Sequence, residues 1–539
     1  MNRLTLTLGT LIVGTGSLFA KQKQPNLVFI FSDQQSYDML GCYGNKDIKT
    51  PVIDQLAREG VRFNYCISSQ PVCCPMRGML MTGQHPLYNG VYTNDVKIIT
   101  GNGATFGQTL KNAGYQTGYI GKWHLYGGNR NRPIPPGADR LGFDVFHSNN
   151  CTVDFRAEKA FYFNEKGEKV YFGEWEVYGQ TDQATDFLRD ADKNKPFALF
   201  VSYHAPHDQG RTRREGLRYE SISGLMDRYD PDSIALRPNA EEISGRNDSG
   251  ENLNDLREDY HGYYAMCTGI DEAVGNIIRT LKETDRLDNT IIVYTSDHGD
   301  NLYSHGRPWA KGTPEDESVR VPLIVKWSQN IKPEQTSNLL IGTLDLMPTI
   351  LGLMNIHIPE TCQGKDLSGD ILGDARTPVK SVPLFFFEPN WRGVFTERYT
   401  FAFDLYEEKG DQSWNVLYDR NIDPYQQHNL FYKPEYREVR DKMFKMTLSW
   451  LKRFNDPVVS EGDLSGICGF RGAKMLCEEC TGELPGRPVD LLHEANLPSR
   501  IPLKMPGPDE ERVLLERIRN REINQIEGLY KEKKEMLIR

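Results

Sequence analysis

The sequence predicts an α/β fold with a large mixed, mostly parallel sheet sandwiched by helices and a smaller C-terminal α+β subdomain. Short apolar strands alternate with helical segments along most of the chain, which is the pattern of a sheet covered on both faces. The chain has 539 residues, of which 38% are hydrophobic, so it can bury one large core and a smaller one. After about Pro383 the pattern changes to strands and turns, followed by a helix that ends near Leu451.

The first twenty residues have the features of a secretory signal peptide. Arg3 precedes an apolar stretch that ends at Ala20. This stretch is too short to span a bilayer, and no other segment has enough uninterrupted apolar residues to do so. Leu18 is large for the position two residues before a cut after Ala20, so the cleavage site stays open. We therefore expect a periplasmic or secreted protein whose mature chain has no membrane span.

Two predicted strands end in the same dipeptide, Ser-Asp. One apolar run rich in β-formers leads into Asp33 and Gln34, and a second leads into Asp297 and His298. Because open α/β sheets bind ligands at their carboxyl edge, the two strand ends are expected to converge on one cation. The alternative is that each aspartate only caps the helix that follows it.

The other elements follow in order along the chain. Strands are predicted at residues 25–31, 196–201, 290–295 and 320–324, and a helix at residues 254–281, where apolar side chains recur at near-helical spacing. Between residues 208 and 253 the sequence turns polar and predicts a long loop. This loop is either a solvated excursion or a wall that holds anionic groups near a site. It contains a cluster of four arginines: Arg211, Arg213, Arg214 and Arg218.

The net charge of −10 argues against a nucleic-acid partner, since phosphate backbones are bound by basic surfaces. An anionic small substrate would meet the same overall repulsion. Its binding would need local positive charge at the site.

The segment from Cys73 to Arg77, Cys-Cys-Pro-Met-Arg, resembles the C-x-P-x-R signature at which sulfatases convert cysteine to formylglycine. Taken alone, such a short motif also fits a turn before a helix. Three further features occur in the order typical of that family: residues 121–125 resemble its G-K-W-H-L segment, residues 203–207 its A-P-H segment, and Lys311 stands at its second lysine. Over residues 25–450 the chain therefore resembles a type I, formylglycine-dependent sulfatase of the alkaline phosphatase superfamily.

The resemblance implies a formylglycine at Cys73 and a divalent metal, of which Ca²⁺ is the expected one. The implied ligands are Asp33, Gln34, Asp297, His298 and an oxygen of the modified Cys73. The chain departs from the commoner family pattern in two places, because Gln34 stands where many members carry Asp and His298 where many carry Asn. Glutamine lowers the ligand charge, and a nitrogen ligand suits manganese or zinc better than calcium. The identity of the metal therefore stays open.

The resemblance also implies roles for the other site residues. Arg77 and the metal would orient the formylglycine hydrate, while Lys122 and Lys311 would neutralise sulfate oxygens. His207 would protonate the leaving sugar alkoxide, either alone or together with Lys311. His124 would then remove a proton from the second hydroxyl, so that sulfate leaves and the aldehyde re-forms.

The expected reaction is the hydrolysis of sulfate esters on a sulfated carbohydrate, with His204 and Arg211 as substrate contacts. His204 has a structural alternative, because the direction of a side chain in an extended segment is hard to judge from sequence. A formylglycine-generating maturation enzyme is the implied partner, and Met76 in place of the usual serine would slow the conversion.

Two other functions are alternatives to sulfate ester hydrolysis. Hydrolysis of phosphonate or phosphate monoesters is the alternative reaction, since an Asp-His pair at the metal also occurs among formylglycine-bearing phosphonate hydrolases. A non-catalytic glycan-binding relative is the other alternative. Such a protein would have lost Cys73, Arg77 or a lysine, and none of these is lost here.

The expected organisation is a signal peptide at residues 1–20, a catalytic domain at 25–383, a C-terminal subdomain at 384–460 and an extension at 461–539. The subdomain resembles the family's four-stranded sheet with one helix. The extension contains a proline-rich segment and a charged helix with a thin apolar stripe. It also contains Cys468, Cys477 and Cys480, for which a disulfide or free thiols are favoured over zinc, because structural zinc sites hold four ligands and a fourth is not evident.

Overall fold

The computed structural model describes residues 24–128, 130–209, 217–240, 256–306, 310–387, 390–404 and 414–456. The predicted signal peptide lies outside these ranges. Arg211 and the extension at 461–539, with its three cysteines, its proline-rich segment and its predicted helix, lie outside them too.

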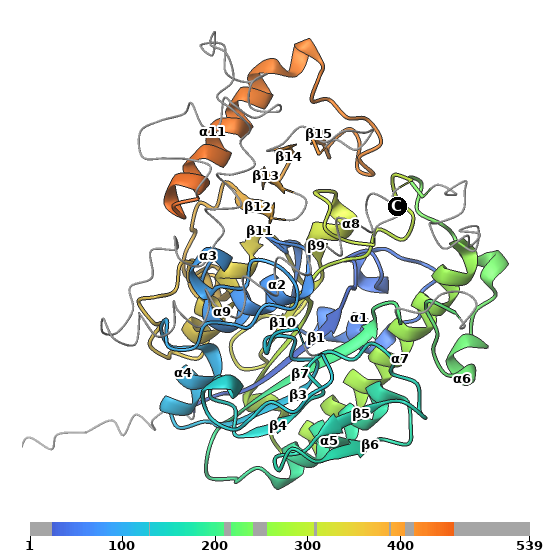
Figure 1. Cartoon of the computed structure of the whole chain (residues 1–539), viewed down its shortest axis with the longest axis vertical. Coiled ribbons are helices and arrows are strands. Elements are labelled where there is room, and N and C mark those ends of the chain that lie inside the picture. Colours follow the sequence, from blue (N-terminus) through green and yellow to red (C-terminus); the bar gives the residue numbers. More distant parts are fainter. Residues whose placement is uncertain are drawn as a thin grey trace, which may run out of the picture.

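A large mixed sheet forms the centre of the molecule (Figure 1). Nine strands of the described ranges build it in the order β11-β2-β10-β8-β1-β7-β3-β4, with β9 paired to β2. Strand β1 is parallel to both β7 and β8, β3 is parallel to β7 and β4, and β10 is antiparallel to β8 and β2. The strands are β1 (Asn26–Asp33), β2 (Val61–Ile67), β3 (Gln116–Gly121), β4 (Val145–His147), β7 (Phe197–Pro206), β8 (Thr290–Ser296), β9 (Arg320–Val321), β10 (Leu323–Lys326) and β11 (Gln335–Gly342).

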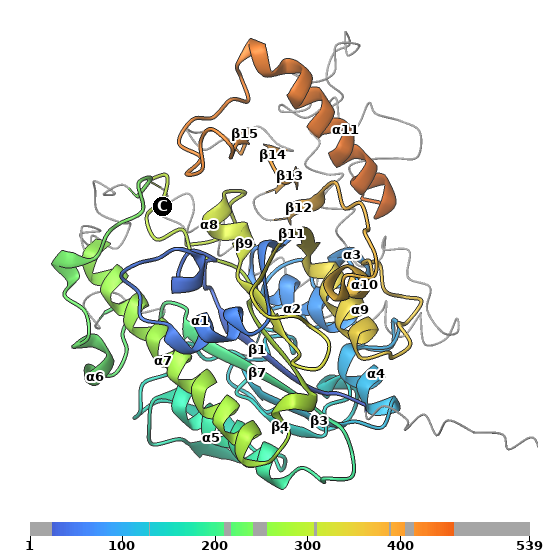
Figure 2. The same cartoon turned by 180° about the vertical axis from the view of Figure 1, so that it is seen from behind.

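Helices cover both faces of this sheet, as the sequence predicted. Alternate residues of β1 enter opposite cores, because side chains of a strand point alternately to its two faces. Phe29 packs in a cluster with residues of α2, α4 and α9, whereas Val28 packs with residues of α1, α5 and α7. Figure 2 shows α7 crossing one face with α5 beside it. The helices are α1 (Pro51–Arg58), α2 (Cys73–Thr82), α3 (Pro86–Asn89), α4 (Phe106–Asn112), α5 (Glu176–Asp190), α6 (Ser223–Met226), α7 (Leu256–Glu283), α8 (Asp316–Val319), α9 (Thr343–Leu353) and α10 (Ser368–Leu372).

The smaller subdomain is an antiparallel sheet in the order β12-β13-β14-β15, covered by one helix (Figure 1). Phe401 and Phe403 of this sheet pack against Phe444 of the helix, in a core of their own. A further cluster joins this sheet to the large one, since Leu384 packs with Ile67. These elements are β12 (Val382–Phe387), β13 (Asn390–Phe395), β14 (Tyr399–Asp404), β15 (Val416–Asp419) and α11 (Arg437–Arg453); a separate hairpin is formed by β5 (Phe161–Phe163) and β6 (Lys169–Tyr171).

Two predicted strands differ from the observed ones. The strand predicted at residues 320–324 is divided at Pro322, because proline cannot donate a ladder hydrogen bond, and its halves β9 and β10 pair differently. Strand β7 runs on to Pro206, beyond the predicted end at residue 201, since β1 pairs with it again at Pro206 after a register shift, whereas its pairing with β3 ends at Ser202. None of the helices that the described ranges contain is both long and apolar enough to cross a membrane.

Candidate active site

Four neighbouring parallel strands bring polar residues to one edge of the large sheet. Asp33 ends β1, Asp297 follows β8, Lys122 follows β3 and His207 follows β7. The backbone N–H of Asp297 donates to the carbonyl oxygen of Ser32 at 3.2 Å, which holds the ends of β1 and β8 together. The convergence of the two Ser-Asp ends is therefore present in the structure, at the carboxyl edge where open α/β sheets bind ligands.

Cys73 is the first residue of α2 and is buried. Its Sγ lies 3.3 Å from His298 Nε2, 3.4 Å from Lys122 Nζ and 3.3 Å from Lys311 Nζ. Burial raises the pKa of this thiol, but Lys122, Lys311 and His298 together hold the pKa well below its usual value. A helix N-terminus and two ammonium groups thus favour negative charge at this position. The sulfur atom stands in for the oxygens of the formylglycine that the motif implies.

A group of possible metal ligands surrounds Cys73. Asp33, Cys73, Asp297 and His298 each offer a ligand atom within 4.8 Å of the others, and all four residues are buried. His298 Nδ1 lies 2.9 Å from the carbonyl oxygen of Gly299, to which it donates, so Nε2 is left as the ring's acceptor and can bind a metal. This donor set of carboxylate oxygens and one imidazole nitrogen fits a divalent cation.

Gln34 has a left-handed backbone, with φ of 68°, and its N–H donates to Asp297 Oδ1 at 3.0 Å. Its side-chain amide is held from both ends. Nε2 donates to Asp300 Oδ2 at 2.6 Å, and Oε1 accepts from Lys311 Nζ at 2.6 Å. These contacts aim the amide oxygen toward the lysine that also touches Cys73. Asp300 was not identified from the sequence, although it stands only three residues after Asp297.

Arg77 is buried and links the two carboxylates. Its guanidinium donates to Asp297 Oδ2 at 2.9 and 3.1 Å and to Asp33 Oδ2 at 3.1 Å. Two further bonds go to the carbonyl oxygen of Lys122 at 2.9 Å and to Ser202 Oγ at 2.7 Å. The geometry therefore gives Arg77 the task of fixing the two carboxylates of the possible metal site.

Lys122 forms a salt bridge with Asp33. Burial and the neighbouring Cys73 oppose ionisation of Asp33, but Lys122, His207 and Arg77 hold its pKa below the usual range. Gly121 lets the chain turn toward Lys122, because a side chain at its φ of 106° would meet the carbonyl oxygen of Ser202 at 2.0 Å.

His207 and Lys311 form a pair at the more open side of Cys73. His207 Nδ1 lies 2.5 Å from the carbonyl oxygen of Asp208, to which it donates. Its Nε2 lies 2.8 Å from Lys311 Nζ and accepts a hydrogen from that ammonium group. The proton between the two side chains is therefore shared, and it lies next to the sulfur of Cys73.

His124 and His204 lie on the other side. His124 is buried, and its Nε2 lies 2.9 Å from Asp95 Oδ1. Burial lowers the pKa of His124, but its neighbours, Asp95 among them, raise it well above the usual value. His204 has no exposed surface, and its Nδ1 lies 2.8 Å from Glu176 Oε2. Of the two roles considered for His204, this burial favours the structural one.

The structure thus places most of the predicted residues around Cys73 and adds three that the sequence did not reveal. Asp95, Ser202 and Asp300 each bind a site residue through a side-chain oxygen. Asp95 lies in a loop without periodic pattern, and Ser202 lies inside the apolar run of β7, so neither carries a local signal. The predicted residues found together are Asp33, Gln34, Cys73, Arg77, Lys122, His124, His207, Asp297, His298 and Lys311.

Known proteins resemble this chain over most of its length. The family described as Sulfatase matches residues 25–356, and the family described as N-sulphoglucosamine sulphohydrolase, C-terminal, matches residues 308–453. An ulvan-active sulfatase from Formosa agariphila is 33% identical over 431 residues, covering 78% of this chain and 80% of that protein. An N-acetylglucosamine-6-O-sulfatase from Bacteroides thetaiotaomicron is 27% identical, covering 85% and 91%. A solved Bacteroides fragilis structure, described as the sulfatase yidJ, has a TM-score of 0.71 at 33% identity, covering 82% and 98%.

Proposed function

We propose, since the chain belongs to the sulfatase family and is a sulfatase, that it removes sulfate from a sulfated carbohydrate with a formylglycine at Cys73. One observation carries the proposal. Cys73 begins a buried helix between two lysines and beside three possible metal ligands, so an anionic ester would find its nucleophile, its charge partners and a cation at one point. The relatives named for ulvan and for N-acetylglucosamine-6-O-sulfate support a carbohydrate as the carrier of the ester.

The proposed cation is Ca²⁺, held by Asp33, Gln34, Asp297 and His298 together with an oxygen of the modified Cys73. When bound, it would supply positive charge that polarises the reacting oxygens. The imidazole nitrogen of His298 is the least typical calcium ligand in this set. Metal analysis of the purified protein after titration with calcium, manganese and zinc would identify the cation.

The side chains divide the chemistry between them. When Cys73 carries formylglycine, its hydrate supplies one hydroxyl that attacks sulfur and a second that later expels sulfate. Lys122 and Lys311 would hold the sulfate oxygens and neutralise their charge. The proton shared by His207 and Lys311 would pass to the leaving sugar oxygen, and His124 would take the proton of the second hydroxyl.

The cellular setting is part of the proposal. A signal peptide at residues 1–20 would direct the protein to the periplasm or the exterior, and a maturation enzyme would first oxidise Cys73. The catalytic domain would span residues 25–383 and the smaller subdomain residues 384–460, with Arg211 as a substrate contact from the loop after β7.

The test is sulfate release from a panel of defined sulfated saccharides, with phosphate and phosphonate monoesters compared at equal concentration. We expect sulfate release from at least one saccharide and slower hydrolysis of both phosphorus esters. The Cys73→Ala protein, purified in the same way, is the control and should be inactive on every ester. Faster hydrolysis of a phosphonate than of every sulfate would contradict the proposed substrate class.

A further inference from the structure

The geometry points to Asp95 as a positioning residue that fixes the tautomer of His124, with Arg130 holding the carboxylate in place. This inference rests on the proposed function, because it concerns the proton transfer assigned to His124. Neither Asp95 nor Arg130 belongs to any of the sequence segments that resemble the family.

The carboxylate of Asp95 joins two partners. Oδ1 lies 2.9 Å from His124 Nε2 and 2.8 Å from Arg130 Nε, while Oδ2 lies 2.7 Å from Arg130 Nη2. The bidentate contact with a planar guanidinium fixes the plane of the carboxylate. A fixed carboxylate in turn fixes the rotation of the imidazole ring that donates to it.

The backbone around this pair is also held in place. Asp95 and His124 both adopt left-handed conformations, with φ of 65° and 56°. The N–H of Asp95 donates to the sulfur of Cys74 at 3.2 Å, next to the nucleophile position, and the N–H of His124 donates to the carbonyl oxygen of Asn150 at 2.8 Å. The two loops are further joined by an antiparallel bridge between Lys97 and Tyr126. Left-handed residues other than glycine persist where surrounding contacts impose them, and they are frequent at functional sites.

The second nitrogen of His124, Nδ1, is the one that Asp95 leaves for other partners. Asp95 contacts Nε2, so the ring can contact the neighbouring sulfur atoms only through Nδ1. Nδ1 is buried and makes no hydrogen bond of ordinary length to a described residue. Cys73 and Cys151 both lie close enough to the imidazole to interact with it. Because a carboxylate accepts only, Nε2 must carry a hydrogen. The raised pKa of His124 favours a second hydrogen on Nδ1, and when the ring gives that hydrogen up, the lone pair is left at Nδ1.

This arrangement suits a proton acceptor. The hydroxyl on the modified Cys73 would give its proton to Nδ1, its electron pair would re-form the aldehyde, and sulfate would leave with the electrons of the broken carbon–oxygen bond. The imidazolium that results would be stabilised by Asp95, as in other pairs where a buried aspartate orients a histidine. Without the carboxylate, the hydrogen could move to Nδ1 and block the acceptor.

The alternative is that Asp95 and Arg130 form only a structural ion pair. Their side chains are 18% and 46% exposed, so the pair contributes on the order of 1 kcal/mol, and an alanine at the left-handed position 95 adds a cost of about 1–2 kcal/mol. Asp95→Ala should therefore fold, with a melting temperature within about 4 °C of the wild type. A loss of function in that variant can then be separated from a loss of structure.

The first measurement is the tautomer of His124, which does not depend on activity. Long-range ¹H–¹⁵N spectra of the protein with unconverted Cys73, recorded at a pH above the pKa of His124 so that the ring is neutral, should show a hydrogen on Nε2 in the wild type and a shift toward Nδ1 in Asp95→Ala, with His124→Ala used to assign the signal. An unchanged tautomer in Asp95→Ala overturns the inference, whatever the sulfate ester assays show.

The second measurement is kinetic and uses the fully converted enzyme. Asp95→Ala should lower kcat about tenfold to a hundredfold with little change in KM, to a similar extent on a sugar sulfate and on nitrophenyl sulfate. In Asp95→Asn the amide oxygen would be held by Arg130 and its NH₂ group would face Nε2, which favours the hydrogen on Nδ1, so its loss should be at least as large as that of Asp95→Ala. If Asp95→Ala keeps the wild-type kcat, or if its kcat/KM falls only because KM rises, the inference is wrong. Absence of sulfatase activity in the wild type would instead count against the proposed function.

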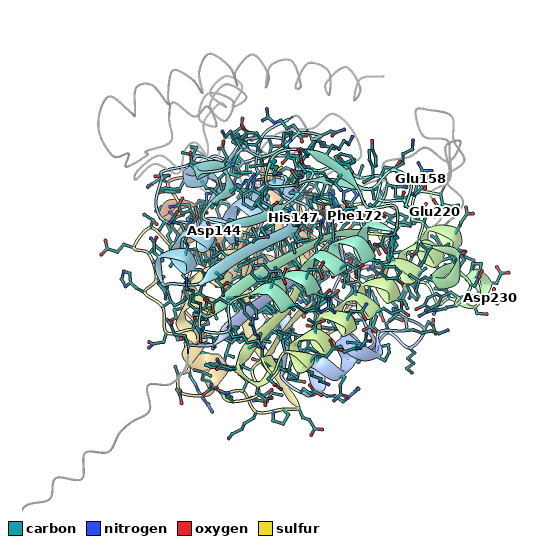
Figure 3. The ribbon with its side chains drawn as sticks, turned by 90° about the horizontal axis from the view of Figure 1, so that it is seen from below. Asp144, His147, Glu158, Phe172, Glu220 and Asp230 are labelled. Atoms are coloured by element: carbon teal, nitrogen blue, oxygen red, sulfur yellow. The ribbon has the colours of Figure 1, made fainter. Side chains whose placement is uncertain are left out.

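A matched control is available at Lys111 and Asp144. This ion pair has a Nζ–Oδ1 distance of 2.5 Å and lies on the surface, with side chains 47% and 55% exposed (Figure 3). Asp144→Asn removes a carboxylate from an ion pair without contact to any site residue. It should leave both the tautomer of His124 and kcat unchanged, and a loss equal to that of the Asp95 variants would show a non-specific effect.

Discussion

His207 should be needed for one kind of leaving group and not for another. A sugar alkoxide is a poor leaving group that requires a proton, whereas nitrophenolate leaves without one. We expect His207→Ala to lose about a hundredfold or more in kcat on a sugar sulfate, which corresponds to about 2.7 kcal/mol of transition-state stabilisation. The loss on nitrophenyl sulfate should be much smaller.

The structure indicates which side chain carries the proton. His207 Nε2 accepts from Lys311 Nζ at 2.8 Å, so the hydrogen between them belongs to the lysine in this state. His207→Gln distinguishes the two donors, because a glutamine oxygen could still accept from Lys311 but could not relay a proton. A large loss in His207→Gln assigns the relay to His207, whereas near wild-type activity assigns the acid to Lys311 alone.

The assay compares sulfate release from both substrates for the wild type, both His207 variants and His124→Ala. His124 acts after the leaving group has gone, so the kcat of His124→Ala should fall to a similar extent on the two substrates once sulfate release limits turnover. The His207 side chain is 12% exposed and bonds to a backbone carbonyl and Lys311, so its truncation should leave the fold intact. Equal losses on both substrates for His207→Ala would refute the division of roles.

The remaining predictions concern maturation, the metal and stability. Cys73 in active protein should carry formylglycine, which mass spectrometry would show as a loss of about 18 mass units. Full activity with an intact thiol would contradict this. Met76→Ser should raise the fraction of the protein in which Cys73 is converted to formylglycine. Asp297→Asn keeps an oxygen for Arg77 but weakens the cation site, so metal content and activity should fall together, and full activity after chelation would exclude the metal assignment. Burial opposes ionisation of Glu317, but His305 and other partners lower its pKa from 4.5 to about 2. Its stabilising effect is present above pH 4.5 and is lost as the pH falls toward 2, so lowering the pH from 7 to 4 should cost on the order of 1 kcal/mol, and urea unfolding of Glu317→Gln should lack that part of the loss.

The sequence predicted the architecture because strand and helix patterns agree with it locally. Alternate residues of β1 are apolar and enter opposite cores, so a run such as the one before Asp33 identifies a strand buried on both faces. The limits of the strands were harder to predict. β7 extends to Pro206 because β1 offers a backbone partner that far, and this tertiary pairing has no local signal.

The site could be predicted where function follows a strand end, and could not where it depends on a loop. Asp33 and Asp297 follow apolar strands, so parallel pairing brings them together. Asp95 is different, since its relation to His124 arises from a bridge between two loops rather than from a pattern in either. His204 was ambiguous because its position in an extended segment did not reveal which face is buried.

The charges at the site explain how an acidic protein can bind an anionic ester. Arg77 and Lys122 both form salt bridges with carboxylates, so the negative charges of Asp33 and Asp297 largely neutralise them. Lys311 differs, because no carboxylate in the described ranges lies within salt-bridge distance of its Nζ, and its contacts are the amide of Gln34, His207 and Cys73. Since Arg77 and Lys122 each share their charge with a carboxylate, Lys311 and the proposed metal would supply most of the net attraction for sulfate, while Lys122 would still donate hydrogen bonds to its oxygens. The same lysine shares its proton with His207, which places anion binding and leaving-group protonation on one side chain.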